Sequence, residues 1–286
     1  MTALAWTSPV DMTSDATLRA WGSELNAKLV AAGLVQTADT GQINWATVTK
    51  GAANAALGYE VWRFSDASIV FKIEYVMGST TTNLPVLYAT VGTGSNGSGA
   101  ITGQASTRNT FSYTAASITP GSTTYPSYLC HTADFFGLAF KFGVGSGIFH
   151  AFLAITKTCD TAGSATTTGF AVYRSQSTGV LAQQVVRTAA AAATRTESTS
   201  FSFVQGLVTD STTPAGDKQR YRHFEHSNGV NPLATMCTYV ASEVSTGSSF
   251  AAAMVGSTAR TFLALGGVLR GEVTGSSNYA TAMLYE

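Results

Sequence analysis

The chain has 286 residues, and its 16 Lys and Arg residues balance its 16 Asp and Glu residues, so the formal net charge is zero. Only 11% of the residues are charged, against about 25% in typical soluble proteins. A neutral chain without a basic stripe excludes the electrostatic attraction on which nucleic-acid binding depends. Copies of such a chain repel one another little, which suits a subunit of a large assembly better than a free monomer.

Two stretches bear on targeting. "MTALAWTSPVDMTSD" (residues 1–15) lacks the basic region and long apolar run of a secretory signal peptide. No window reaches the roughly 18 consecutive apolar residues of a membrane helix. The nearest window, residues 142–155, contains glycines together with Ser146 and His150, and a turn followed by a strand explains it better. We therefore expect synthesis in a cytoplasm, no signal peptide and no membrane partner.

Residues 14–32 are predicted to form an amphipathic helix. Ser14 or Asp15 can cap its first turn by accepting a backbone N–H, and Gly33 follows where a left-handed C-terminal cap is favoured. Apolar side chains recur at spacings of three and four residues, which places them on one face of the helix. These side chains are Leu18, Trp21, Leu25 and Leu29.

The strip "TADTGQINWATV" (residues 37–48) follows this helix and raises the question of why a chain so poor in charge gathers polar residues there. A catalytic loop is one explanation and a packing joint is another. Residues 39–41, Asp-Thr-Gly, can form an Asx- or ST-type turn, and residues 43–45, Ile-Asn-Trp, alternate as in a short edge strand. We predict a structured connector that joins helix to sheet, with polar groups satisfied by the backbone. The side chains concerned are Asp39, Gln42, Asn44 and Trp45.

From Tyr59 onward the pattern changes to short β-segments. Residues 59–64 alternate, so that Tyr59, Val61 and Arg63 share one face and Glu60, Trp62 and Phe64 the other. Residues 69–77 are expected to pair with them in a hairpin, and residues 84–92 form a third strand. Further predicted strands are residues 109–115, 135–143, 147–156, 168–175, 179–188, 200–208, 219–226, 234–244, 249–256 and 260–270.

Many strands separated by Gly, Ser, Thr and Asn clusters, without helices between them, indicate a mainly β, antiparallel β-sandwich or jelly-roll-like fold with one N-terminal amphipathic helix. We divide the chain into an N-terminal attachment module, residues 1–95, and a β-rich outer domain, residues 96–286. A further boundary is placed at residues 187–196, "RTAAAAATRT", and the two parts can equally form one continuous domain.

Two motifs invite a chemical interpretation. "GTGSNG" (residues 92–97) matches GxGxxG, but no helical stripe follows it, so a flexible β-loop explains it better than a dinucleotide site. "HFEH" contains His223, Glu225 and His226. On a helix the two imidazoles could share a metal, but on a strand they point to opposite faces. We expect a polar strand face or a loop at a subunit contact.

The remaining reactive side chains are dispersed. His131 and His150 are isolated in the sequence, so neither supplies a third ligand for the "HFEH" cluster. Cys130, Cys159 and Cys237 form no CxxC pair, and we expect three thiols in apolar surroundings. The carboxylates are scattered and are not gathered with aromatic residues as in a sugar-cleaving cleft. We therefore predict no enzyme, and we assign no catalytic residue, no cofactor and no metal.

Longer stretches of the chain resemble a known family. They are "LRAWGSELNAKLVAAGLVQTADTGQINWATVTKGAANAALGYEVWRFSDA" (residues 18–67), "FKIEYVMGS" (71–79), "VGTGSNGSGAITG" (91–103) and a later echo, "GIFHAFLAITKTCDTAGSATTTGFAV" (147–172). They resemble the N-terminal signature and middle strand pair of bacteriophage proteins described as virion structural or minor tail proteins. The chain departs from that pattern at Gly51, where family members often carry proline, and in residues 68–75, which are shorter than usual.

The resemblance implies a non-enzymatic component of a phage particle, located in the virion and most simply on the tail or a tail fibre. Alternatives are a capsid decoration protein and, from another class, a tail-tip domain that binds or depolymerises a host polysaccharide. Expected partners are other phage structural proteins and further copies of the chain. A trimer is favoured because three-fold and six-fold positions dominate tails and capsids. A host-surface glycan is a further candidate partner.

Overall fold

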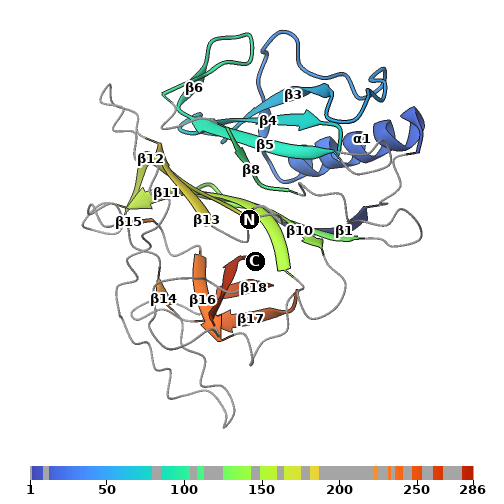
Figure 1. The fold of residues 1–286 in the computed structure, drawn as a ribbon. Helices are drawn as coiled ribbons and strands as arrows, with labels where there is room; N and C mark the ends of the chain where they lie inside the picture. Colours follow the sequence, from blue (N-terminus) through green and yellow to red (C-terminus); the bar gives the residue numbers. More distant parts are fainter. Residues whose placement is uncertain are drawn as a thin grey trace.

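The computed structural model describes residues 2–8, 13–78, 85–103, 108–112, 125–142, 149–159, 164–174, 181–186, 222–223, 231–232, 236–240, 247–252, 260–266 and 279–285. Over these residues the protein is mainly β, with antiparallel strand pairing throughout and a single helix. The described strands form a sandwich of layers, with the helix on one side (Figure 1). The predicted fold class is therefore confirmed as a mainly β, antiparallel fold with one N-terminal helix.

The helix, α1 (Asp15–Ala31), lies where it was predicted. Ser14 caps it in a reciprocal arrangement with Thr17, in which each side chain accepts the other residue's backbone N–H. Gly33 adopts a left-handed conformation with φ +92° and ends the helix, as its position in the sequence indicated. The predicted apolar stripe, together with Gly22, forms the buried face of α1.

A five-stranded sheet lies beside α1, in the order β2-β3-β4-β5-β8. The predicted alternation in residues 59–64 is confirmed, because Trp62 and Phe64 enter the main core while Val61 lies in a separate cluster on the opposite face. The bounds are β2 (Val35–Gln36), β3 (Ala56–Arg63), β4 (Val70–Val76), β5 (Val86–Gly92) and β8 (Asn109–Thr110).

A small hairpin, β6 (Gly94–Ser95) and β7 (Ile101–Thr102), connects to this sheet. Ile101 packs on Val61 and Val70, which form the small cluster on the outer face. The boundary predicted between residues 95 and 96 falls inside this hairpin. Strand pairing also crosses this boundary where β8 pairs with β5.

The central layer is formed by strands of the large sheet, in the order β1-β9-β10-β11, with β12 and β13 continuing beyond β11. Because β1 pairs with β9, the first residues of the chain belong to this layer and not to the five-stranded sheet. The bounds are β1 (Thr2–Ser8), β9 (Tyr125–His131), β10 (Phe135–Phe142), β11 (Phe149–Cys159), β12 (Ala165–Arg174) and β13 (Leu181–Val186).

The C-terminal strands continue the large sheet and cover the far face of the central layer (Figure 1). They are β14 (Arg222–His223), β15 (Asn231–Pro232), β16 (Met236–Val240), β17 (Ser249–Ala252), β18 (Arg260–Gly266) and β19 (Tyr279–Leu284). The strand predicted at residues 200–208 and the boundary predicted at 187–196 lie outside the described residues.

Alternation along the central strands produces two cores. In β10, Phe136, Leu138 and Phe140 face α1 and the five-stranded sheet, while Phe135 and Ala139 face the C-terminal strands. Each core is thus closed on one side by the same central layer, as expected when a strand is buried on both faces.

Candidate functional site

The predicted connector, residues 37–48, lies between β2 and β3 and packs against α1. Trp45 is buried, and its indole N–H donates to Glu60 Oε1 at 3.0 Å. Residues 43–45 form no edge strand: Ile43 donates its N–H to Tyr59 O at 2.8 Å, and a turn begins at Asn44. The edge-strand prediction is wrong because the backbone turns so that Trp45 can enter the core.

Glu60, on β3, is completely buried and is surrounded by neutral donors. Its Oε1 accepts from Trp45 and from Asn26 Nδ2 at 2.7 Å, so α1 and the connector both meet at this oxygen. Its Oε2 accepts from the Trp62 indole at 3.4 Å and from the Tyr75 hydroxyl. A buried carboxylate is tolerable only when hydrogen bonds replace its hydration. Glu60 therefore joins helix, connector and sheet through one side chain.

Tyr75 completes this centre from β4. Its burial, together with the negative charge of Glu60, raises the pKa of the Tyr75 phenol well above its ordinary value. The phenol therefore keeps its proton and donates to the carboxylate. The rings of Trp45 and Tyr75 meet edge to face at 4.9 Å, and Trp21 of α1 contacts Trp45 in the same manner at 5.9 Å. These edge-to-face contacts favour one arrangement of the rings.

Gly22 of α1 is required by the position of Trp45. A Cβ atom at residue 22 would lie 2.0 Å from Cε3 of the Trp45 ring. The indole therefore packs directly on the helix backbone, which only glycine permits. The Trp21-Gly22 pair of α1 and Trp45 of the connector are thus two halves of one contact.

Gln42 acts as a substitute for a strand at the edge of β3. Its Oε1 accepts the Val61 N–H at 2.7 Å, and its Nε2 donates to Thr37 O at 2.7 Å. One side chain therefore satisfies the backbone of β3 and of the connector. Asn44 has a more local role, since its Oδ1 accepts the Ala46 N–H at 2.9 Å in an Asx-type turn.

Asp39 joins the connector to the β6–β7 hairpin. Its Oδ2 accepts the Gly99 N–H at 2.8 Å and the Ser95 hydroxyl, and its Oδ1 accepts the Thr37 hydroxyl at 2.6 Å. Burial opposes ionisation of this carboxyl, but the hydrogen bonds outweigh it and lower the pKa of Asp39. The chain turns at Thr40 and Gly41 as predicted, with Gly41 at φ +81°. The Asp39 carboxylate, however, bonds to a segment about 60 residues away.

The "GTGSNG" motif (residues 92–97) supplies β6 and the start of the turn in this hairpin, and Gly99 follows in the same turn. The Thr40 N–H donates to Gly97 O at 2.9 Å, and Gly99 lies against the Tyr59 ring, where a Cβ atom would approach to 2.3 Å. Gly97 and Gly99 both adopt φ +83°. The glycines serve turn geometry and close packing, and the following residues form β7 instead of a helix, so the motif lacks the geometry of a dinucleotide site.

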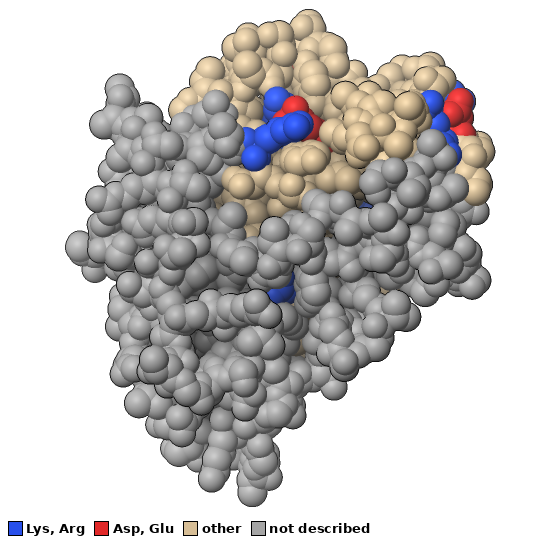
Figure 2. Space-filling model, viewed as in Figure 1, with Lys and Arg blue, Asp and Glu red and all other residues tan. Residues whose placement is uncertain are grey.

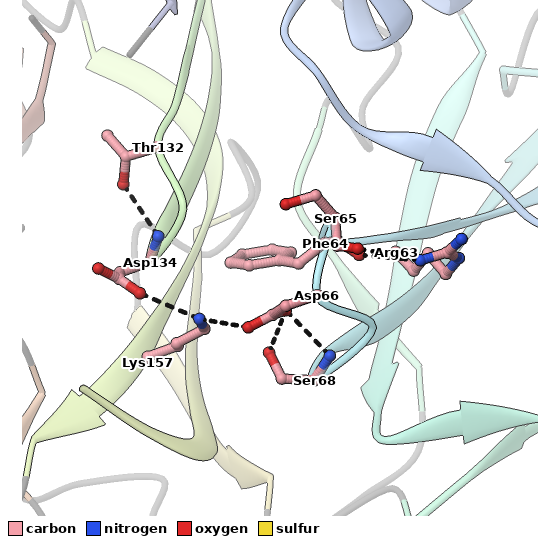
Figure 3. A network of polar contacts seen from close by, with 8 residues as sticks. All are labelled: Arg63, Phe64, Ser65, Asp66, Ser68, Thr132, Asp134 and Lys157. Carbon is pink, nitrogen blue, oxygen red and sulfur yellow. Dashed lines mark hydrogen bonds and ion pairs between the residues drawn. The ribbon is translucent and has the colours of Figure 1, made fainter.

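A second polar centre joins the two sheets (Figure 3). Lys157 of β11 is 8% exposed, and its Nζ lies 2.6 Å from Asp66 Oδ2 and 3.0 Å from Asp134 Oδ1. Asp66 is in the β3–β4 turn and Asp134 in the β9–β10 turn. Burial disfavours the ammonium, but the two carboxylates outweigh that effect and raise the pKa of Lys157. Although burial opposes its ionisation, Lys157 and Ser68 lower the pKa of Asp66 to about 2.

His131 is a further contact between the layers. It is buried on β9, and its Nδ1 lies 2.7 Å from Ala32 O at the end of α1, while the Phe64 ring meets it edge-on at 5.3 Å. Burial lowers the pKa of His131, so the neutral imidazole is favoured. His131 thus fixes the helix end to the central layer.

The remaining candidate site residues form no further polar centre among the described side chains. The backbone of His223 pairs with Cys237, but its side chain and the rest of the "HFEH" cluster lie outside the described residues, as does the side chain of His150. Cys130 is buried in the second core and forms no disulfide. Within the described ranges, no three His, Cys, Asp or Glu side chains gather as metal ligands would, and no helix has the length and apolarity to cross a membrane.

No protein-family model, no curated protein and no solved structure matches the chain.

Proposed function

We propose that the protein is a non-enzymatic structural component of a bacteriophage particle, most simply of the tail or a tail fibre. The resemblance of residues 18–67 to virion structural proteins suggests this role. The observation that carries the proposal is that three residues of this stretch, Trp21, Trp45 and Glu60, meet in one buried joint. We infer that residues 18–67 form a rigid connection between the helix, the connector and the sheet.

The chemistry of this joint supports a scaffold over an enzyme. Each carboxylate oxygen of Glu60 accepts two hydrogen bonds, and the carboxylate is completely buried. A general acid or base must reach a substrate within hydrogen-bonding distance. Glu60 has neither a free acceptor position nor solvent access, so its role is to hold three elements together.

The outer face of the five-stranded sheet offers little to a polysaccharide. Arg108 lies over the Tyr88 ring at 4.3 Å and Lys72 over the Tyr59 ring at 5.7 Å, so cations cover these aromatic faces. Glu74 pairs with both cations, at 3.5 Å and 3.9 Å. Elsewhere on the described surface in view, Figure 2 shows a second group of charged side chains at the right edge. We therefore favour protein partners over a glycan at this face.

We further propose that the helix and connector form the side that attaches to the particle. The test uses particles assembled without this protein, to which purified full-length chain is added. Wild-type chain should bind. Ala27→Glu, on the exposed face of α1, should weaken binding, whereas the matched variant Ala133→Glu, in the exposed β9–β10 turn, should not. Failure of the wild-type chain to bind would contradict the structural role, and loss only in the second variant would reverse the orientation.

A further inference from the structure

Among the described strands, β1 lies at one edge of the large sheet. It pairs with β9 without a register shift from Thr2 to Ser8, and among the described strands it has no neighbour on its other side. An edge strand of this kind directs alternate N–H and C=O groups outward. Natural sheet edges are usually blocked by charged side chains, proline or bulges. The strand "TALAWTS" contains none of these.

We propose that this edge pairs with the same edge of a second copy of the chain, antiparallel about a two-fold axis that passes at Ala5. In this register every residue of β1 has a partner, because the strand is centred on Ala5. Leu4 of each copy lies opposite Trp6 of the other, and Ala3 lies opposite Thr7. Apolar side chains thus meet apolar ones, and small exposed side chains meet small ones.

The burial pattern agrees with this arrangement. Leu4 and Trp6 point toward the main core, where Leu4 is only half-buried at the sheet edge. Ala3, Ala5 and Thr7 are exposed on the opposite face. A second strand would therefore extend the sheet and cover Leu4, while the alanines offer no obstacle to close approach.

A second copy is the partner that the electrostatics favour. The strand itself has no charged residue, and the nearby cation, Lys28 of α1, lies over the Trp6 ring at 6.0 Å. The chain has zero net charge, so long-range repulsion does not oppose self-association. Like edges that meet about a two-fold axis close the contact, so the assembly stops at a pair. The inference replaces the expected trimer with a dimer. It rests on β1 alone, so it does not depend on the proposed role in a particle.

The test places one cysteine in the full-length chain at either of two exposed positions on the same strand face, Ala5 or Thr7. In the proposed register Ala5→Cys faces its own copy, with Cα atoms about 4.5–5.5 Å apart, a separation that a disulfide can bridge. The two copies of Thr7→Cys would be about 14 Å apart, four residues along the strand. Ala3 is not used, because its partner on β9 is Cys130, with which a new cysteine could form a disulfide within one chain. Mild oxidation should therefore shift Ala5→Cys to twice the chain mass in denaturing gels, reversibly with reductant.

Thr7→Cys and the wild-type chain should stay at the single-chain mass under the same oxidation, and light scattering of the wild-type chain should give twice the chain mass. Equal melting temperatures of the two variants would show that both are folded. A single-chain mass for Ala5→Cys, or cross-linking of Thr7→Cys to the same extent, would overturn the proposed pairing.

Discussion

Trp45 and Glu60 are 15 residues apart in the sequence, and the indole N–H of one donates to the buried carboxylate of the other at 3.0 Å. This bond explains why the connector turns inward. The strip that resembles a catalytic loop in composition directs its aromatic residue into the core, and its polar groups complete the hydrogen bonding of the sheet edge and the neighbouring hairpin.

Glu60→Gln should destabilise the fold although it preserves side-chain size. The amide nitrogen would face donors in place of an acceptor, and a buried group left without a partner costs about 1–3 kcal/mol. Chemical unfolding should show the loss as a lower midpoint. Glu74→Gln, on the half-exposed face of β4, should cost less than about 1 kcal/mol. Equal effects of the two variants would contradict the central position of Glu60.

Gly22→Ala should also destabilise, although alanine favours helix by about 1 kcal/mol relative to glycine. The added methyl group would lie 2.0 Å from the Trp45 ring, and forced overpacking typically costs about 1–3 kcal/mol. Ser23→Ala, at the next and exposed position of α1, is the matched control and should be neutral. Because the strain requires the indole, the double variant Gly22→Ala/Trp45→Leu should lose less stability than the sum of the single changes.

The helix, the first strands and the contact between Gly22 and Trp45 show which features the sequence could reveal and which it could not. The apolar stripe on α1 and the alternation of residues 59–64 are local patterns. The helix, the strand and the buried face of each could therefore be predicted from residue spacing alone. Gly22 gives no local signal, because glycine within a helix is explained only by the distant ring that packs on it. Alternation over residues 43–45 predicts an edge strand, but three residues cannot reveal that the backbone turns and that Trp45 enters the core.

The remaining gaps have the same physical origin. β1 was not predicted, because "TALAWTS" is short and its outward residues are small and apolar, which weakens the alternation. Asp66, Asp134 and Lys157 come from three separate elements, and only the fold brings them together. A usable signal was a single lysine in an otherwise apolar strand, since a buried ammonium requires carboxylates.

Asp39→Asn should loosen the β6–β7 hairpin without unfolding the protein. An amide in place of the carboxylate weakens the charge-assisted bonds to Ser95 and Gly99, so the Gly99 amide should exchange its hydrogen faster with solvent. Asp15→Asn is the matched control: it makes the same substitution at an aspartate that accepts the Lys50 N–H, and it should leave the exchange of the Gly99 amide unchanged. Since the pKa of Asp39 is lowered, this contribution to stability is present above the ordinary carboxyl pKa and is lost as pH falls through the lower value.

Lys157 should be easier to replace than its carboxylates. Lys157→Met removes a mostly buried charge and leaves Asp66 and Asp134 in contact with solvent, at 47% and 40% exposure. At neutral pH the cost should be below about 1 kcal/mol. The double variant Asp66→Ala/Asp134→Ala strands the ammonium in a buried position and should cost more. Thermal unfolding of both variants checks this order, and a larger loss in Lys157→Met would contradict it.

The same centre should respond to acid. The pKa of Asp66 is lowered from 3.8 to about 2, so its pairing with Lys157 stabilises the protein fully above pH 4. The stabilisation is lost as pH falls from about 4 to about 2, where the carboxyl gains its proton in the folded state. Unfolding curves recorded over this range should converge for the wild-type chain and Lys157→Met. Parallel curves would show that the pair contributes nothing.

The central claim is a structural role in a phage particle, and the copy number of the chain in purified particles tests it most directly. Quantitative mass spectrometry against a capsid protein of known copy number provides the measurement. A tail or tail-fibre component should be present in a few to tens of copies per particle, and a capsid decoration protein in hundreds. Absence of the chain from purified particles, with abundant free chain in the infected cell, would contradict the proposed function.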